Sequence, residues 1–180
     1  KANINATIAE SLQRFEPILK AARHIDMPVR GYISCVTDCP YDGPTDPGAV
    51  AQVADRLFSM GCYEISLGDT IGQATPDSIA RMLIAVRDHV PVSRLAGHYH
   101  DTAGRALANI DASLSLGVRV FDAAVGGLGG CPYAPGASGN VATEAVADHL
   151  ERLGYQTGLD MDVLNRAAGM AQAMRGGDGA

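Results

Sequence analysis

Two histidines separated by one residue give the strongest chemical signal in this sequence. His98 and His100 close the mostly apolar run of residues 95–100, a pattern that favours a β-strand. Because side chains alternate between the faces of a strand, both imidazoles point to the same side of the sheet. Two imidazoles side by side are a typical pair of metal ligands, and the alternative is two polar residues with ordinary hydrogen-bond partners. Asp101 follows directly and can either orient an imidazole or begin the next helix.

A glycine-rich loop over residues 126–140 is the second signal. So many glycines after a strand indicate either close approach of the backbone to a ligand or a lid that bends. Cys131 stands between Gly130 and Pro132, where it is either a reactive thiol or an inert small residue. Asn140 precedes a helix-like segment, so its default role is that of an N-cap, with a role as ligand as the alternative.

A carboxylate and a hydroxyl follow another apolar run. Asp69 and Thr70 can bind substrate or fix neighbouring ligands there, and the alternative is a capped turn between strand and helix. Tyr32, within an earlier strand-like run, can present its hydroxyl to the same site. For Tyr32 the pattern favours a buried core residue.

Strand-like and helix-like segments alternate four times and form the scaffold for these residues. We expect strands over residues 29–36, 62–67, 95–100 and 118–125. Helices should begin at Asp46 with Pro47 and at Thr75 with Pro76, and should cover residues 104–116 and 141–153. Flanking helices are expected over residues 7–25 and 160–174, with Pro17 kinking or dividing the first.

Alternation of strands and helices predicts an α/β fold with a parallel sheet. Polar residues after the strand ends favour a (β/α)8 TIM barrel over an open sheet, and no GxGxxG follows the first strand. Only four strands are visible, so we interpret residues 1–180 as a single partial domain, the C-terminal half of such a barrel. The start at Lys1 is interpreted as a truncation, with the N-terminal strands absent.

The composition of the chain limits the classes of partner that it can bind. The chain has 14 basic and 20 acidic residues, a formal net charge of -6 and no Lys/Arg run, which argues against nucleic acid and against an anionic membrane. No stretch approaches the ~18 apolar residues of a membrane span. No charged-apolar-small leader opens the sequence either, so we expect a cytoplasmic location. The four cysteines form no paired CxxC pattern, so we expect reduced thiols.

Four motifs of the sequence together resemble those of a known family. GYISCVTDCPYDG, MGCYEISLGDTIG, GHYHDTAGRALAN and GLGGCPYAPGASGNVATE occur in this order and resemble hydroxymethylglutaryl-CoA lyases over residues 3–164. The last motif is the specific one, since HxHD is shared with isopropylmalate and homocitrate synthases and with 4-hydroxy-2-oxovalerate aldolases. Ala124 and Gly126 depart from the Ser and Ala usual in the family.

The resemblance implies a metal site and a proton donor. It makes His98, His100 and the side-chain oxygen of Asn140 ligands of a divalent cation, Mg or Mn, and Cys131 the thiol at the reacting centre. Asp69 becomes a supporting acidic residue. The family also has an Arg-Asp pair in its N-terminal half, which supplies a further metal ligand and a contact to the substrate carbonyl and has no counterpart in this sequence.

The implied reaction is the cleavage of 3-hydroxy-3-methylglutaryl-CoA to acetyl-CoA and acetoacetate, a step of leucine degradation and ketone-body metabolism. A base takes the proton of the C3 hydroxyl, the C2–C3 bond breaks, and the resulting enolate receives a proton. His98 is placed to relay protons as well as to bind metal, and Cys131, with an ordinary pKa of ~8.5, can protonate the enolate. The partner is then an acyl-CoA substrate, and we allow for a homodimer.

Two rival functions remain. A related barrel synthase would condense acetyl-CoA with a 2-oxo acid, but those enzymes usually carry a Glu-containing loop where this chain has Cys131. A half-barrel without catalytic function is the other rival, and the intact His98, His100, Cys131 and Asn140 argue against it. We expect the chain by itself to be inactive.

Overall fold

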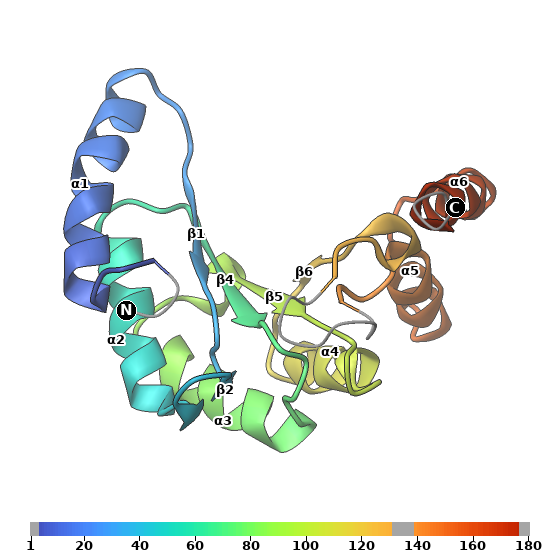
Figure 1. Ribbon diagram of the computed structural model, residues 1–180, viewed down its shortest axis with the longest axis horizontal. Coiled ribbons are helices and arrows are strands. Elements are labelled where there is room, and N and C mark those ends of the chain that lie inside the picture. The colour runs from blue at the N-terminus through green and yellow to red at the C-terminus, as the bar shows by residue number, and fades with distance from the viewer. Residues whose placement is uncertain (1–3, 131–138, 177–180) are drawn as a thin grey trace.

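A four-stranded parallel sheet with strand order β1-β4-β5-β6 forms the centre of the computed structural model (Figure 1). The structure describes residues 4–130 and 139–176, with side chains as far as residue 174. The strands are β1 (Arg30–Ile33), β4 (Glu64–Asp69), β5 (Leu95–Tyr99) and β6 (Val120–Asp122).

A helix follows each of these strands, which confirms the predicted order of β-then-α units. These helices are α2 (Pro47–Ser59), α3 (Pro76–Arg87), α4 (Ala106–Ser115) and α5 (Thr143–Arg152). Helix α1 (Ile8–His24) precedes the sheet and α6 (Met161–Gly176) follows it. The connections contain the hairpin of β2 (Asp38–Cys39) and β3 (Gly43–Pro44) and the 3-10 turns η1 (Val92–Arg94) and η2 (Val125–Gly127).

The two helix starts read from the sequence are confirmed. The side chain of Asp46 accepts hydrogen bonds from the N–H groups of Gly48 and Ala49, and Thr75 accepts one from Ser78. A proline follows each cap, where its missing N–H costs no helical hydrogen bond.

Of the two expected effects of Pro17, a kink or a division, the division is wrong, because α1 runs unbroken from Ile8 to His24. Proline cannot donate to the carbonyl of Gln13, one turn earlier. Both residues are exposed, so water can satisfy this carbonyl without a break in the helix.

Strand boundaries differ from those predicted because helix ends take up backbone groups that the pattern assigned to strands. The N–H of Cys62 bonds to the carbonyl of Leu57 in α2, and that of Val118 bonds to Ser113 in α4. Strand pairing therefore starts two residues late in both cases. The first strand ends early, and its chain turns at Cys35, which has a φ of 58°.

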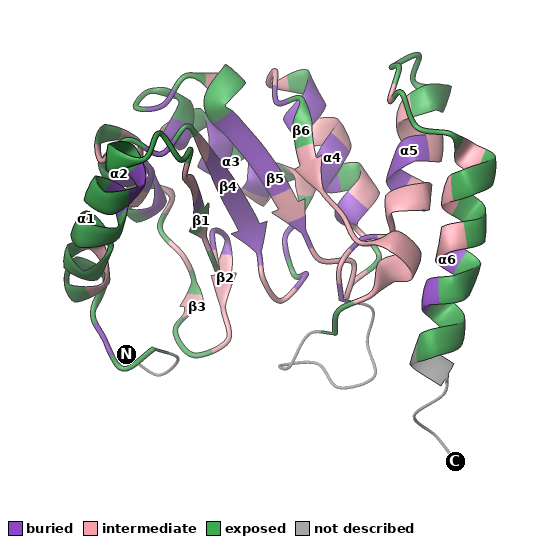
Figure 2. Ribbon diagram, turned by 90° about the horizontal axis from the view of Figure 1, so that it is seen from above, coloured by how far each residue is buried: buried purple, intermediate pink, exposed green. Residues whose placement is uncertain are grey.

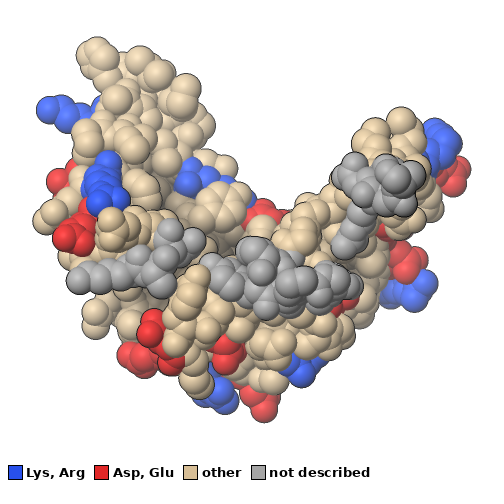
Figure 3. Space-filling model, viewed as in Figure 1, with Lys and Arg blue, Asp and Glu red and all other residues tan. Residues whose placement is uncertain are grey.

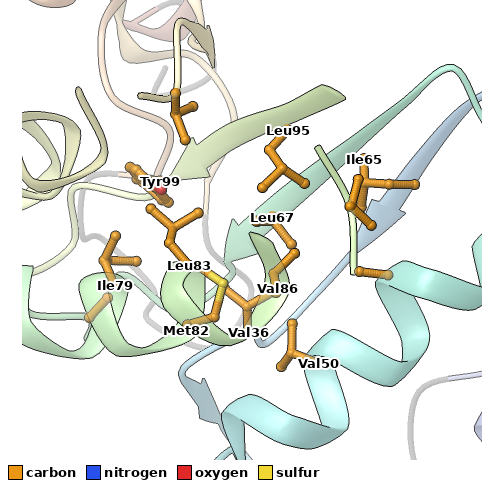
Figure 4. Close-up of a cluster of buried hydrophobic side chains, with 14 of the residues drawn as sticks. Val36, Val50, Ile65, Leu67, Ile79, Met82, Leu83, Val86, Leu95 and Tyr99 are labelled. Carbon is orange, nitrogen blue, oxygen red and sulfur yellow. The ribbon is translucent and has the colours of Figure 1, made fainter. Parts of the chain in front are cut away.

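The sheet separates an apolar face from a polar one. Odd-numbered strand residues such as Ile65, Leu67 and Leu95 are buried against the helices, as Figure 4 shows, and Figure 2 shows β4 and β5 largely buried. Even-numbered residues face the other side, where Figure 3 shows the molecule hollowed between the part with α1 and the part with α5 and α6. The polar or charged side chains among them are Arg30, Tyr32, Glu64, Ser66, His98 and Asp122.

Gly97 provides a test of this packing. A Cβ at Gly97 would lie 2.8 Å from two ring atoms of Tyr99, whose buried hydroxyl is 2.8 Å from Ser113 Oγ. The Tyr99 ring is held by the backbone at one end and by the hydrogen bond of its hydroxyl at the other, so it cannot move aside. Gly97→Ala should therefore lower the free energy of unfolding by ~1–3 kcal/mol. Chemical denaturation measures this change.

The matched control is Gly169→Ala in α6, where the added carbon would have nothing within 4 Å beyond its chain neighbours and the backbone of its own helix. That substitution should leave stability unchanged or raise it by up to about 1 kcal/mol through helix propensity. Equal stability of the two variants would contradict the packing described for Tyr99.

Candidate functional site

Both predicted imidazoles lie together at the C-terminal end of β5. The ring centroids of His98 and His100 are 5.6 Å apart, and both side chains are partly buried. Burial, followed by the nearby charge of His98, lowers the pKa of His100. The neutral imidazole is therefore favoured, which is the form that binds a metal.

Asn140 joins this pair from a distant part of the sequence. It forms an isolated β-bridge with His100, and its Nδ2 donates to the carbonyl of Leu128 over 3.0 Å. This hydrogen bond directs the amide oxygen Oδ1 away from that carbonyl, so the oxygen is available to a ligand. Two histidines and one amide oxygen thus come from the end of β5, with the residue that follows it, and from the segment before α5.

The expected role of Asn140 as an N-cap is wrong. Helix α5 begins at Thr143 with Ala142 as its N-cap, two residues later than predicted. The intervening backbone bonds to the sheet instead, with Val141 N–H on the carbonyl of Tyr99 and Ala124 N–H on that of Val141. Tertiary hydrogen bonds therefore hold Asn140 at the strand ends.

A charged network on the polar face was missed from the sequence. Arg30 Nη1 lies 2.7 Å from Asp122 Oδ1, and its Nε lies 2.6 Å from Glu64 Oε2. Ser66 donates to Asp122 Oδ2 over 2.7 Å, and Nδ1 of His98 lies 3.3 Å from the same oxygen. The network connects all four strands and reaches the histidine pair.

Electrostatics keep this network charged. Burial alone would raise the pKa of Asp122, but hydrogen bonds from His98, Ser66 and Arg30 and the charge of Arg30 lower it from 3.8 to about 2. Burial likewise opposes the charge of Arg30, and the contacts with Asp122 and Glu64 outweigh it and raise the pKa of the guanidinium. A signal in the sequence was the presence of charged residues at alternate positions of strand-like runs.

Tyr32 lies on the same polar face. Its side chain is 58% exposed, so the buried core position that the pattern favoured is wrong. The hydroxyl accepts a hydrogen bond from Arg30, and the ring meets that of His98 edge-on at 6.3 Å between centroids. Tyr32 therefore lies beside His98, with its hydroxyl on Arg30.

Asp69, Thr70 and Asp101 bond to backbone. Asp69 is buried and accepts from the N–H groups of Gln73 and Ala74, and this burial raises the pKa of its carboxyl despite those bonds. Thr70 Oγ1 accepts from the N–H of Cys35, and Asp101 accepts from that of Ala106 at the start of α4. These contacts agree with the capped-turn and helix-start alternatives and place the three side chains at a strand end and in the turns that follow the strands.

Three of the four cysteines lie in the part of the chain that the structure describes. Cys35, Cys39 and Cys62 are free, as expected of reduced cysteines. Cys131, the predicted reactive thiol, lies outside the described residues.

The side chains available as metal ligands limit the kind of cation site that can form here. Over residues 4–130 and 139–176, no group of three or more His, Cys, Asp and Glu side chains could hold a metal ion. A site here therefore needs the amide oxygen of Asn140 beside His98 and His100. Nδ1 of His100 is buried and has no hydrogen-bond partner in the described part of the chain, which fits a nitrogen that awaits a ligand.

Comparison with families gives one match over nearly the whole chain, to the family model described as HMGL-like, across residues 1–170. The hydroxymethylglutaryl-CoA lyase of Pseudomonas mevalonii is 56% identical over 162 residues, which are 90% of this chain and 54% of that protein. The chain thus spans about half the length of the curated relatives it matches.

Solved structures of lyases share the fold of this chain. The HMG-CoA lyase of Brucella melitensis superposes with a TM-score of 0.96 at 60% identity and covers 97% of this chain and 62% of its own. An HMG-CoA lyase from Acinetobacter baumannii in complex with coenzyme A and 3-methylmalate gives a TM-score of 0.85 at 35% identity, over 93% and 54% of the two chains. The chain thus has the fold of the C-terminal half of a TIM barrel, as predicted.

The names of the relatives point to more than one cellular compartment. A lyase of Gallus gallus named mitochondrial is 57% identical over 91% of this chain and 55% of its own length. One of Mus musculus named cytoplasmic is 55% identical over 89% and 47%. None of the helices described here is long and apolar enough to cross a membrane.

Acid stability tests the charged network. Because the folded-state pKa of Asp122 lies below its usual value, its ionised form stabilises the fold above pH 3.8, and this contribution is lost as the pH falls to about 2. A shift of this size corresponds to ~2.5 kcal/mol, which we reduce to about 1–2 kcal/mol for the partial exposure of the side chain. Denaturation between pH 5 and pH 2 measures it.

Asp122→Asn should be less stable at pH 5 and lose less stability on acidification. Asp111→Asn, which alters an ion pair of an exposed carboxylate with His149, serves as the control. The same acid slope in the parent and in Asp122→Asn would show that Asp122 does not stabilise the fold.

Proposed function

This chain belongs to the HMGL-like family, and from this premise we propose that it carries the cation-binding half of the active site of a lyase. The proposed reaction cleaves 3-hydroxy-3-methylglutaryl-CoA to acetyl-CoA and acetoacetate. The observation that carries the proposal is the convergence of His98, His100 and Asn140 at one strand end in a chain 60% identical to a solved HMG-CoA lyase.

His98, His100 and Asn140 are the proposed ligands of a Mg or Mn ion. When bound, such an ion would orient oxygens of the substrate and lower the pKa of its tertiary hydroxyl. The neutral state of His100, its unpartnered Nδ1 and the free direction of the Asn140 oxygen support this assignment.

The chemistry requires one proton to leave and another to arrive. When a base takes the C3 hydroxyl proton, the C2–C3 bond can break, and the electron pair of that bond moves onto the thioester as an enolate. We assign the proton that neutralises this enolate to the thiol of Cys131, because a thiol with an ordinary pKa of ~8.5 is mostly protonated at neutral pH. Support for Cys131 comes from its place in the GLGGCPYAPGASGN motif.

The substrate is proposed to be an acyl-CoA, with support from the coenzyme A with which the Acinetobacter baumannii lyase forms its complex. Asp69, Thr70 and Asp101 support the site through the turns that they fix, and Tyr32 lines the polar face beside it. A cytoplasmic location, a homodimer and a part in leucine degradation remain predictions.

Activity is tested in a protein that joins this chain to the remaining barrel strands, because the chain spans about half of its relatives. We expect acetoacetate from 3-hydroxy-3-methylglutaryl-CoA in the presence of Mg or Mn, and none from the 180 residues alone. Cys131→Ser should lower kcat by ~10²- to 10⁴-fold with KM and Tm nearly unchanged.

Cys39→Ser, which changes a thiol of the β2–β3 hairpin, is the control and should stay within a few-fold of the parent. A Cys131→Ser enzyme with unchanged kcat would remove the thiol from the mechanism. Absence of cleavage in the complete parent protein would refute the proposed function.

Two neighbouring glycines test the cation site separately. A Cβ at Gly129, whose φ is 91°, would lie 2.6 Å from Nδ2 of Asn140, whereas one at Gly130 would have nothing within 4 Å. Gly129→Ala should therefore displace the amide and weaken Mn binding about tenfold or more, and Gly130→Ala should not. Titration with Mn distinguishes the two, and equal affinities would exclude Asn140 as a ligand.

A further inference from the structure

The carboxylate of Asp122 is held from both sides and faces an imidazole. Its Oδ1 lies 2.7 Å from Arg30 Nη1, and its Oδ2 accepts the hydroxyl of Ser66 over 2.7 Å. The third contact joins Oδ2 to Nδ1 of His98 over 3.3 Å. Asp122 and His98 are direct partners in the β5–β6 register, so their side chains leave the sheet on the same face.

The hydrogen-bonding capacity of the Asp122 carboxylate decides which partner donates in the contact with His98. A carboxylate paired with a guanidinium is ionised and has only acceptors, so the hydrogen between Asp122 and His98 must belong to the imidazole. In a neutral ring a proton on Nδ1 leaves Nε2 with the free lone pair. The contact thus selects one of the two tautomers.

The rest of the network limits how far this carboxylate can rotate. Arg30 is fixed by Glu64 at 2.6 Å and stacks on the ring of Tyr32, with its guanidinium carbon 5.0 Å from the ring centroid. Ser66 is fully buried. Each oxygen of Asp122 therefore has a donor from a different strand.

We propose that Asp122 is a positioning residue, which holds His98 as the Nδ1–H tautomer and directs its Nε2 to the cation and substrate, while Arg30 and Ser66 hold Asp122. The inference deepens the proposed function and rests on it for the identity of what Nε2 meets. The tautomer itself depends only on the chain.

One consequence concerns the proton relay expected of His98. With Nδ1 bound to Asp122, the imidazole offers a single nitrogen to the site. Nε2 can hold a cation or accept a proton, but it cannot do both at the same time.

Long-range ¹H–¹⁵N correlation spectra of the cation-free chain, with labelled histidine at pH 8, report the tautomer of each neutral ring. The chain has five histidines, and His98→Gln identifies the relevant signals. We expect the Nδ1–H form for His98. In Asp122→Asn the amide oxygen should stay on Arg30 and its NH₂ should face His98, which would convert the ring largely to the Nε2–H form.

Asp111→Asn is the matched control, because Asp111 pairs with Nε2 of His149 at 2.7 Å, away from the strand ends. That variant should change the His149 signals and leave those of His98 unchanged. An Nε2–H form of His98 in the parent, or the same His98 tautomer in the parent and in Asp122→Asn, would overturn the proposal. If Asp122→Asn does not fold, the tautomer of the parent still decides, and Ser66→Ala, which frees one side of the carboxylate, should give a mixture.

Mn titration adds a second readout. A protonated Nε2 cannot bind a metal, so Asp122→Asn should bind Mn ~10- to 100-fold more weakly while Asp111→Asn binds as the parent does. An unchanged affinity in Asp122→Asn would refute positioning by Asp122. The spectra need neither cation nor substrate, so failure of the positioning role and failure of the lyase function give separate results.

Discussion

The alternation of side chains between the two faces of a parallel sheet is the constraint on which the rest of this structure depends. One residue in two must face the helices, and these positions hold the apolar core of residues such as Ile65, Leu67 and Leu95. The next residue in each case must face the hollow side. A single shift of register would bury Arg30 and Asp122 among aliphatic side chains, so the core and the candidate site specify each other.

Charges on the hollow side are acceptable because groups of opposite charge lie next to one another. Arg30 lies between Glu64 and Asp122, and Ser66 and His98 complete the environment of Asp122. Removing one partner would leave a partly buried charge without compensation, which costs more than the net gain from any single pair. The cluster therefore connects the four strands mechanically and also fixes the ring at the strand end.

The strand ends complete the site through backbone hydrogen bonds. The segment before α5 returns to the sheet, where Val141 bonds to Tyr99 and Asn140 lies beside His100. Gly129 lets Asn140 approach, because any side chain there would meet its amide. The donor set of two imidazoles and one amide oxygen at these strand ends supports the cation site that we propose.

The sequence by itself determined the α/β alternation, two helix starts and the histidine pair, because caps, hydrophobic periods and a spacing of two are local properties. It also carried the motifs by which the family could be named. Tertiary structure alone decided that Asn140 leaves the helix cap for the strand end, that Tyr32 is exposed, and that Arg30 meets Asp122 across 92 residues. These depend on which strands become neighbours and in what register, and no local pattern encodes that.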